Sequence, residues 1–357
     1  MEDIARLAGV SKSAVSLALN GKPGVSSETR DTILRIANEN GYAIKSKPIA
    51  DDKFKSITFL VFTNSGIVLE QYDHQPFFRE LIQYIEERCR NFGYSLLFKS
   101  IDVKHINSDL QQLLEVTGSE GIILLGTNLH ESHIFQVHQL VRMPLVVLDT
   151  YIETLPLPFV QINNTMGADQ AAQHLYQLGH TTIGYIESST RVANFEERKS
   201  GFHRSWNKLG LSIAPQHTLS VIPTILSSQE SLKAQLQALI NSGEPLPTAF
   251  FCECDYIAIS AIKTLNELGF QIPQDITVVG FDNIAEASIV TPELTTVHVE
   301  KKQMAYQAVD LILQEIDNTD QAKTKIKIDT SFIERRSSIL LNTRTKAKIG
   351  GSSQFIK

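Results

Sequence analysis

Two spacings in the sequence could belong to a catalytic or metal site. Residues 121–126 form Gly-x-x-x-x-Gly, the frame of a phosphate-binding loop, and three histidines follow closely, His130, His133 and His138. A phosphate loop continues with Lys and then Ser or Thr, whereas Thr127 and Asn128 follow here. Spacings of three and five do not put the three histidines on one helix face. Because the motifs of dinucleotide-binding folds and serine hydrolases are also missing, we expect no enzymatic activity, no cofactor and no metal.

Polar side chains near the N-terminus could instead bind DNA. Four of them fall within six residues, Ser11, Lys12, Ser13 and Ser16. Hydroxyl and ammonium groups can donate hydrogen bonds to phosphates and to base edges in a major groove. They can act together only from one helix, and Ser11 is a good N-cap for a helix over residues 12–19. Asn20, which with Gly21 ends this helix, completes the contacts predicted from the head.

Two more helices are needed to hold this recognition helix. Apolar residues recur with helical spacing over residues 3–8, and Gly9 follows where a helix would end in a left-handed residue. Only two residues separate Gly9 from the next helix, so the pair forms a helix-turn-helix. A third helix, capped by Ser26 and extending to residue 40, supplies the apolar residues that cover the pair, Ile33, Leu34, Ile36 and Ala37.

Charge is distributed unevenly along the chain. The net charge is −6, but residues 1–48 carry seven basic and five acidic side chains, a net +2, which leaves −8 for the rest. A mildly basic head on an acidic body suggests a separate unit with its own partner. Since +2 is a small charge, DNA binding should depend on dimerisation and specific contacts and have a shallow salt dependence.

The head sequence closely resembles a known family of DNA-binding proteins. From residue 3 to 30 it reads DIARLAGVSKSAVSLALNGKPGVSSETR, which resembles the head of the lactose-repressor (LacI/GalR) family of bacterial transcription regulators. The resemblance implies a helix-turn-helix domain at residues 1–47 that reads operator DNA, followed by a linker at residues 48–56.

The linker departs from the pattern of that family, in which a hinge helix wedges a leucine into the minor groove. Pro48 falls where the helix interior should be, and Asp51 stands near the place of the leucine. An acidic side chain is unfavourable in a groove of negative potential. We therefore expect a weak or displaced hinge and little DNA bending, with Lys45 and Lys47 on phosphates and Ile49 as the nearest wedge.

Beyond residue 56 the chain alternates between strand and helix patterns. Apolar runs at 57–62, 95–98, 121–125 and 145–148 alternate with helical stretches near 77–92, 107–116 and 131–141, and the cycle restarts at 165–178 and continues to a strand at 276–281. Such alternation predicts two doubly wound parallel sheets with helices on both faces. Ligands bind such sheets at the carboxyl ends of the strands, so a site between two lobes is expected.

The body resembles the effector domain of the same family, which is similar to the periplasmic sugar-binding fold. Four segments carry the resemblance, at residues 75–81, 166–180, 198–202 and 272–283. It implies that an effector domain spans 57–340 and crosses between lobes three times. Lobe 1 would take 57–161 and 290–323, and lobe 2 would take 162–289 and 324–340. Residues 341–357 lack a leucine heptad, so a flexible tail is expected rather than a tetramerising coil.

Carried over to this sequence, the resemblance implies an effector site. Asp282 would accept hydroxyl hydrogen bonds, Arg198 would donate from a planar fork, and Phe77 or Phe78 would cover the apolar side of a ring. The set is completed by residues directly after strands, Asp149, Cys254 and Asp255, although the family usually carries Asn where Cys254 stands. Two plainer alternatives remain: Asp282 caps the next turn, and Arg198 pairs with Glu196 or Glu197 on the surface.

These features favour one function over two others. We expect a homodimeric repressor that binds a pseudo-palindromic operator and responds to a sugar-like effector, rather than a binding protein with a vestigial head or an enzyme on the same fold. No run of 18 apolar residues and no secretory signal is present, so we expect a cytoplasmic protein. The three cysteines (Cys89, Cys252 and Cys254) lack metal-type spacing and should be buried, reduced thiols.

Overall fold

The computed structural model describes residues 2–19, 24–39, 55–68, 72–106, 108–110, 118–225, 228–318 and 322–341. The chain forms two compact units, Met1–Lys55 and Ser56–Lys357, each of which is described by itself. Several predictions made from the sequence lie outside the described residues: Asn20, the hinge residues Lys45, Lys47 and Ile49, most of the helix predicted at 107–116, and the tail beyond residue 341.

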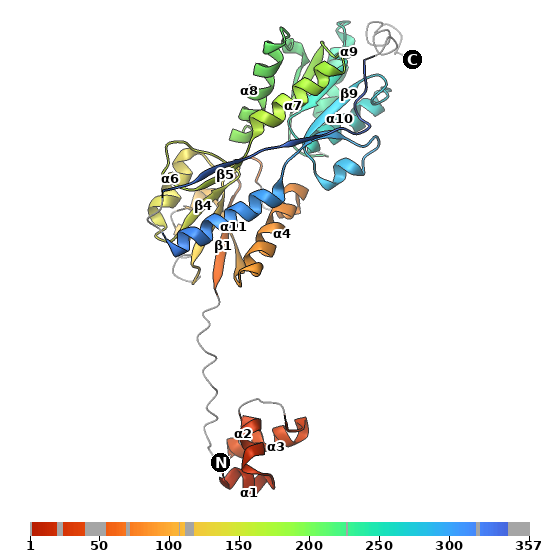
Figure 1. Ribbon diagram of the computed structural model, residues 1–357. Helices are drawn as coiled ribbons and strands as arrows, with labels where there is room; N and C mark the ends of the chain where they lie inside the picture. The colour runs from red at the N-terminus through yellow and green to blue at the C-terminus, as the bar shows by residue number, and fades with distance from the viewer. Residues whose placement is uncertain are drawn as a thin grey trace. The chain divides into compact units, whose positions relative to one another are not determined.

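The first unit is a bundle of three short helices (Figure 1), α1 (Glu2–Ala8), α2 (Lys12–Leu19) and α3 (Ser27–Glu39). The predicted turn is confirmed, since Gly9 has a φ of 64°, and Ser11 caps α2 by accepting the Ala14 N–H at 3.2 Å. Ser26 caps α3 in the same way through the Thr29 N–H at 3.2 Å. A small shared core holds the helices together, Ile4, Val15, Ala18, Ile33 and Ala37.

The first sheet of the body is entirely parallel. Its strands lie in the order β11-β5-β4-β3-β1-β2, where they are β1 (Ser56–Thr63), β2 (Ser95–Asp102), β3 (Gly121–Leu125), β4 (Leu145–Leu148), β5 (Phe159–Ile162) and β11 (Lys325–Ile328). Every residue of β1, β3, β4 and β5 is buried, as expected for strands covered on both faces. The helices of this lobe that lie wholly within the described residues are α4 (Pro76–Asn91), α6 (Glu131–Leu140) and α11 (Lys301–Asp317), with short turns η1 (Tyr72–His74) and η2 (Val103–His105).

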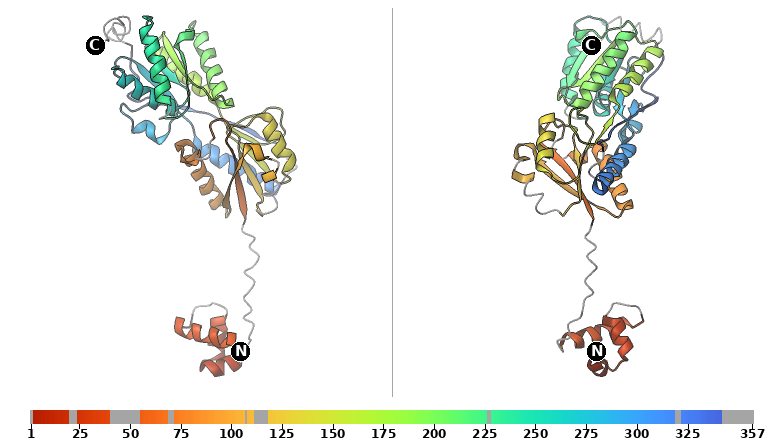
Figure 2. Two further views of the ribbon diagram at one scale, coloured as in Figure 1. Left: turned by 180° about the vertical axis from the view of Figure 1, so that it is seen from behind. Right: turned by 60° about the vertical axis from the view of Figure 1, so that its left-hand side comes forward.

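The second sheet repeats the plan. Its order is β12-β10-β9-β8-β6-β7, where the strands are β6 (Ile183–Ser188), β7 (Thr218–Val221), β8 (Ala249–Cys252), β9 (Thr277–Asp282), β10 (Thr295–His298) and β12 (Ser331–Ile333). All neighbours are parallel except β12, which runs antiparallel to β10. Helices flank the sheet on both faces (Figure 2): α7 (Asn164–Gln177), α8 (Ala193–Lys208), α9 (Ser228–Asn241) and α10 (Asp255–Glu267), with η3 (Pro215–His217) and η4 (Ala285–Ser288). The predicted architecture of two doubly wound lobes is confirmed.

Two of the predicted crossings between lobes fall at the wrong place. The first crossing, between β5 and α7, lies within a few residues of the predicted one. However, β10 pairs with β9, so residues 290–298 belong to lobe 2 and not to lobe 1. In the same way β11 pairs with β5, so residues 324–328 belong to lobe 1. The physical reason is the backbone hydrogen bonding of each strand, which fixes its lobe regardless of position in the sequence.

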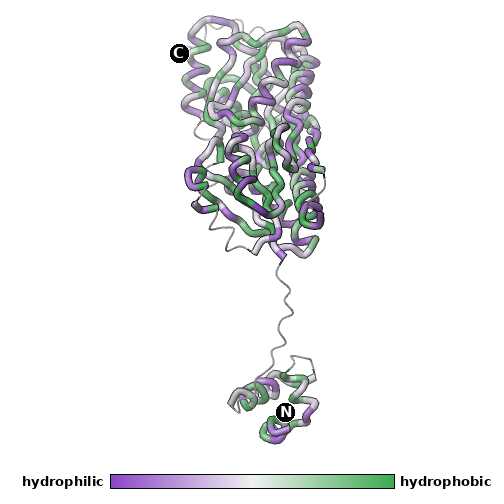
Figure 3. The backbone as a smooth tube through the Cα atoms, turned by 90° about the vertical axis from the view of Figure 1, so that its left-hand side faces the viewer, coloured by the Kyte–Doolittle hydropathy of each residue, from purple (hydrophilic) through white to green (hydrophobic). Residues whose placement is uncertain are grey.

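The body helices are amphipathic, and hydrophilic and hydrophobic stretches alternate along them (Figure 3). The core of lobe 2 contains an aromatic cluster in which Trp206 and Phe251 both stack on Phe202, with ring centroids 5.8 and 4.6 Å away. In the described part of the chain, no helix is both long and apolar enough to span a membrane.

Candidate functional site

The residues predicted to read DNA surround the start of α2. Ser11, Lys12 and Ser13 are exposed and Ser16 is half-buried, so the first turn of the helix presents a polar surface. The hydroxyls of Ser11 and Ser13 lie 2.8 Å apart. The Lys12 ammonium lies 2.6 Å from a carboxylate oxygen of Glu2 on α1. Lys12 therefore already has an anionic partner, which a DNA phosphate or base would have to replace.

A pocket lies between the lobes of the body, at the carboxyl ends of strands from both sheets. Its cavity volume is only about 40 Å³, so the closed lobes leave little free space in it. Parallel sheets place polar loop residues at this edge, and two sheets facing each other bring two such edges together. Six of the seven residues predicted for the effector site line the pocket, namely Phe77, Phe78, Asp149, Arg198, Cys254 and Asp282.

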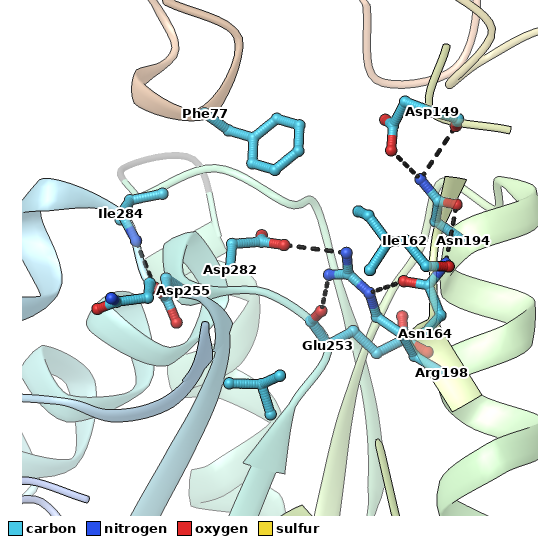
Figure 4. Close-up of polar contacts among 12 residues, drawn as sticks. Phe77, Asp149, Ile162, Asn164, Asn194, Arg198, Glu253, Asp255, Asp282 and Ile284 are labelled. Carbon is cyan, nitrogen blue, oxygen red and sulfur yellow. Dashed lines mark hydrogen bonds and ion pairs between the residues drawn. The ribbon is translucent and has the colours of Figure 1, made fainter. Parts of the chain in front are cut away.

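Arg198 is the central polar group of the pocket (Figure 4). Its side chain is 4% exposed, and its Nη2 atom lies 2.9 Å from Asp282 Oδ1 in an ion pair. Its Nε donates to Asn164 Oδ1 at 2.9 Å, and its Nη1 donates to the Glu253 carbonyl at 2.7 Å. The guanidinium carbon lies 3.7 Å from the centroid of the Phe281 ring. Four contacts thus fix the fork in one orientation, and its carboxylate partner is Asp282, not a surface glutamate.

The two pocket carboxylates sit on strained backbone. Asp149 has a φ of 66° and Asp282 a φ of 114°, values that residues other than glycine rarely adopt. This conformation occurs directly at the ends of β4 and β9 and turns both side chains into the pocket. Strain of this kind persists only where the surrounding structure enforces it, and it concentrates at binding sites.

Burial shapes the protonation of both carboxylates. Burial raises the pKa of Asp149 to about 6, although the hydroxyl of Thr127, which donates to Oδ2 at 2.5 Å, and the positive charge of Arg198 oppose the shift. Burial also raises the pKa of Asp282 above its usual value, while Arg198 and Lys301 pull it down. Near neutral pH the pocket therefore holds one compensated ion pair and a second carboxyl group that gains or loses a proton easily.

Asp255, the seventh predicted residue, does not line the pocket. It is fully buried, and its Oδ1 accepts the Thr296 hydroxyl at 2.6 Å while its Oδ2 accepts the Ile284 N–H at 2.9 Å. The side chain therefore ties the start of α10 to the turn after β9 and to β10. Figure 4 shows its contact with Ile284. Burial, followed by the nearby charge of Asp282, raises the pKa of Asp255 to about 8.

Several pocket residues were not predicted from the sequence. Asn194 at the start of α8 donates to Asp149 Oδ1 at 3.0 Å, and the Phe77 N–H donates to the Tyr256 hydroxyl oxygen at 3.1 Å. Both contacts join lobe 2 to lobe 1 across the pocket, so the lobes are held closed. Asn164 orients Arg198, and its position just after an apolar strand was the signal that could have found it. Other unpredicted residues complete the lining, Ile67, Gln75, Thr127, Val192, Phe195 and Pro223.

Comparisons with known proteins match both units. The family model for "Bacterial regulatory proteins, lacI family" matches residues 1–44, and a model for a periplasmic binding protein-like domain matches residues 172–338. The HTH-type transcriptional repressor PurR of Pasteurella multocida (strain Pm70) is 27% identical over 341 residues, which cover 94% of this chain and 98% of that protein.

Two solved structures have the same fold. The lac repressor dimer bound to operator and the anti-inducer ONPF has a TM-score of 0.70 at 21% identity, covering 94% of this chain and 98% of that one. The complex of the transcriptional regulator CelR with cellobiose has a TM-score of 0.68 at 22% identity, again covering 94% of this chain and 98% of that one.

Proposed function

This chain belongs to the lacI family of bacterial regulatory proteins, and we propose that it binds a pseudo-palindromic operator as a homodimer and responds to a small sugar-like effector in the inter-lobe pocket. It is a helix-turn-helix transcriptional repressor with a periplasmic-binding-protein-like effector domain. The family regulates transcription, and its members are not enzymes. The operator geometry, the effector class and the contact residues are the new parts of the proposal.

The observation that carries the effector proposal is the buried pair of Arg198 and Asp282. Taking two charges out of water is costly, and a fold keeps such a pair where it has a use or where other hydrogen bonds compensate it. Here the pair lines a pocket, and Asp282 Oδ1 lies within 2.9 Å of the guanidinium without forming a well-aligned hydrogen bond. A ligand hydroxyl can satisfy that oxygen, and this favours a ligand rich in donors.

The charges of the pocket favour a neutral effector over an anionic one. Among the described residues that line it, Arg198 is the one cation, whereas Asp149 and Asp282 are two acidic groups. A phosphorylated or carboxylated ligand would bring further negative charge to a cation that is already paired. Phe77, Phe78 and Phe195 add aromatic walls for an apolar ring face. A hydroxyl-rich, uncharged ring matches this surface, and CelR, one of the structural relatives, has been solved with cellobiose.

The head supports binding to operator DNA. Ser11, Lys12, Ser13 and Ser16 stand where α2 would enter a major groove, with its first turn toward the base edges. One such head reads only a few base pairs, so two heads on a two-fold symmetric site are needed for affinity and register. The related lac repressor was solved as a dimer on its operator, which supports the same arrangement for this chain. Asn20, Lys45 and Lys47 remain further proposed contacts.

Two experiments test the proposal. Selection of bound duplexes from random DNA by the full-length chain should return an inverted repeat, and replacing Lys12 and Ser13 together should abolish the selected binding. Recovery of sequences without two-fold symmetry would contradict the dimer model. Thermal-shift screening against neutral sugars, nucleosides and phosphorylated metabolites tests the effector class, and stabilisation by phosphorylated compounds alone would contradict the preference for a neutral ring.

A further inference from the structure

Lys301 is a buried lysine at the junction of the two lobes. It is the first residue of α11, and its side chain is only 3% exposed. Its ammonium donates to the backbone carbonyls of Asp282 and Asn283, each at 3.1 Å, and lies 3.4 Å from Glu80 Oε2. The amine therefore has partners in three directions, which accounts for how it is accommodated in the interior.

The partners of Lys301 belong to different lobes. Glu80 lies on α4, which packs against α11 in lobe 1, whereas Asp282 ends β9 in lobe 2 and Asn283 follows it. The chain itself crosses between the lobes just before Lys301, after β10. A rotation of one lobe against the other would pull the ammonium from the carboxylate or from the carbonyls. Breaking the contacts of a buried charge is strongly unfavourable, so these contacts resist the rotation.

Lys301 also lies beside the effector pocket. Its nitrogen is 5.9 Å from the centroid of Phe77, which lines the pocket, and it holds the backbone of Asp282, whose carboxylate pairs with Arg198. The φ of 114° at Asp282 is a strained conformation, and a donor fixed on its carbonyl helps to enforce it. Lys301 thus contacts the acidic wall of the pocket from lobe 1 without lining the pocket itself.

We propose that Lys301 is a positioning residue that holds the lobes closed by tying the Asp282 turn of lobe 2 to Glu80 and α4 of lobe 1. This inference rests on the proposed function only in that the pocket it closes is the effector site. The buried charge of Lys301 thereby links the shape of the pocket to the position of α4. Loss of the charge should favour lobe opening, and a guanidinium, which keeps both the charge and the donors, should preserve closure.

The three cysteines of the chain provide the assay. Cys254 lines the pocket, whereas Cys89 and Cys252 are buried in the cores of lobes 1 and 2. Alkylation of the full-length protein by N-ethylmaleimide, with each cysteine quantified by peptide mass spectrometry, separates opening of the pocket from unfolding. Opening exposes Cys254 alone, while unfolding exposes all three thiols.

We expect K301M to accelerate alkylation of Cys254 at least tenfold relative to Cys252, and K301R to restore the wild-type ratio. The matched control is K302M, which removes the neighbouring, exposed lysine of the same helix and should leave the ratio unchanged. An unchanged Cys254 rate in K301M, or an equal acceleration at all three cysteines, would overturn the proposal. The assay needs neither DNA nor effector, so its failure is distinguishable from failure of the proposed function.

Discussion

Replacing Asp255 by Asn should remove a pH dependence from the stability of the effector domain. The carboxyl group is fully buried, and burial raises its pKa to about 8, compared with the usual 3.8. Between these two values the folded chain holds a proton at this site that the unfolded chain has released. The free energy of unfolding therefore falls as pH rises through this window, by up to about 1.4 kcal/mol per pH unit for one group.

Asparagine is the appropriate perturbation because it imitates the protonated acid. Its carbonyl can still accept the Ile284 N–H, and its amide can donate to the Thr296 hydroxyl oxygen, so both contacts of the wild-type side chain are retained. The variant is neutral at every pH and has no titration in the window. Relative to wild type, it should gain stability steadily from pH 5 to pH 8.

Fluorescence of Trp206 makes the measurement specific. It is the only tryptophan, it is fully buried, and it lies on α8 in the same lobe as Asp255. Urea unfolding at pH 5, 6, 7 and 8 gives the slope for each protein. D149N is a second variant. Because the pKa of Asp149 is about 6, its effect on the pH dependence of stability should be confined to lower pH than that of D255N. If wild type and D255N showed parallel pH dependence, Asp255 would be ionised in the fold, and its assignment as a buried neutral acid would be wrong.

Three further outcomes are expected. E2Q should raise the affinity for a selected duplex roughly twofold to fivefold, because Glu2 then no longer competes with DNA for Lys12. The gain should vanish when E2Q is combined with K12Q, and D3N, which removes the carboxylate paired with Arg6, should show none. An equal gain in E2Q, in E2Q combined with K12Q and in D3N would refute the competition. R198M should lower the free energy of unfolding of the body by about 3–5 kcal/mol in urea titrations, since it leaves Asp282 buried without its cation. R198M combined with D282N should recover part of this loss, and no recovery would show that the two side chains are not coupled. The logarithm of DNA affinity should fall only gently with the logarithm of salt concentration, because the head carries few basic residues, and a slope near −10 would contradict this.

Local signals in the sequence were sufficient to predict most elements of the fold. The recognition helix is bounded by a capping serine at Ser11, and the apolar runs at 121–125 and 145–148 are both β-strands with those bounds. Strands β10 (Thr-Thr-Val-His) and β11 (Lys-Ile-Lys-Ile) were missed because polar residues interrupt them, so neither forms an apolar run. The partner of β11, β5, is more than 160 residues away in the sequence, so no local pattern reports the pairing.

The inter-lobe pocket was predicted less completely than the fold. A family resemblance identified six residues that do line one pocket, but it did not reveal which way an adjacent side chain turns. Cys254 and Asp255 are neighbours, yet one faces the pocket and the other faces the protein interior, because Cys254 precedes α10 and Asp255 is its first residue. Asn194 and Tyr256 were missed for a related reason: their role is a contact across the lobes, which depends on how the two sheets face each other.

The closed pocket also limits how an effector can act. Asp149 accepts from Thr127 and Asn194, and Arg198 pairs with Asp282, so most of these polar groups have partners, while Asp282 Oδ1 can still accept a further hydrogen bond. An effector shifts the balance between lobe arrangements only by what it gains in one over the other. A ligand that bridges the two carboxylates should strengthen closure and slow alkylation of Cys254, whereas one that displaces Asn194 from Asp149 should open the lobes and accelerate it. An effector that changes DNA affinity without changing the Cys254 rate would show that the signal does not pass through lobe closure.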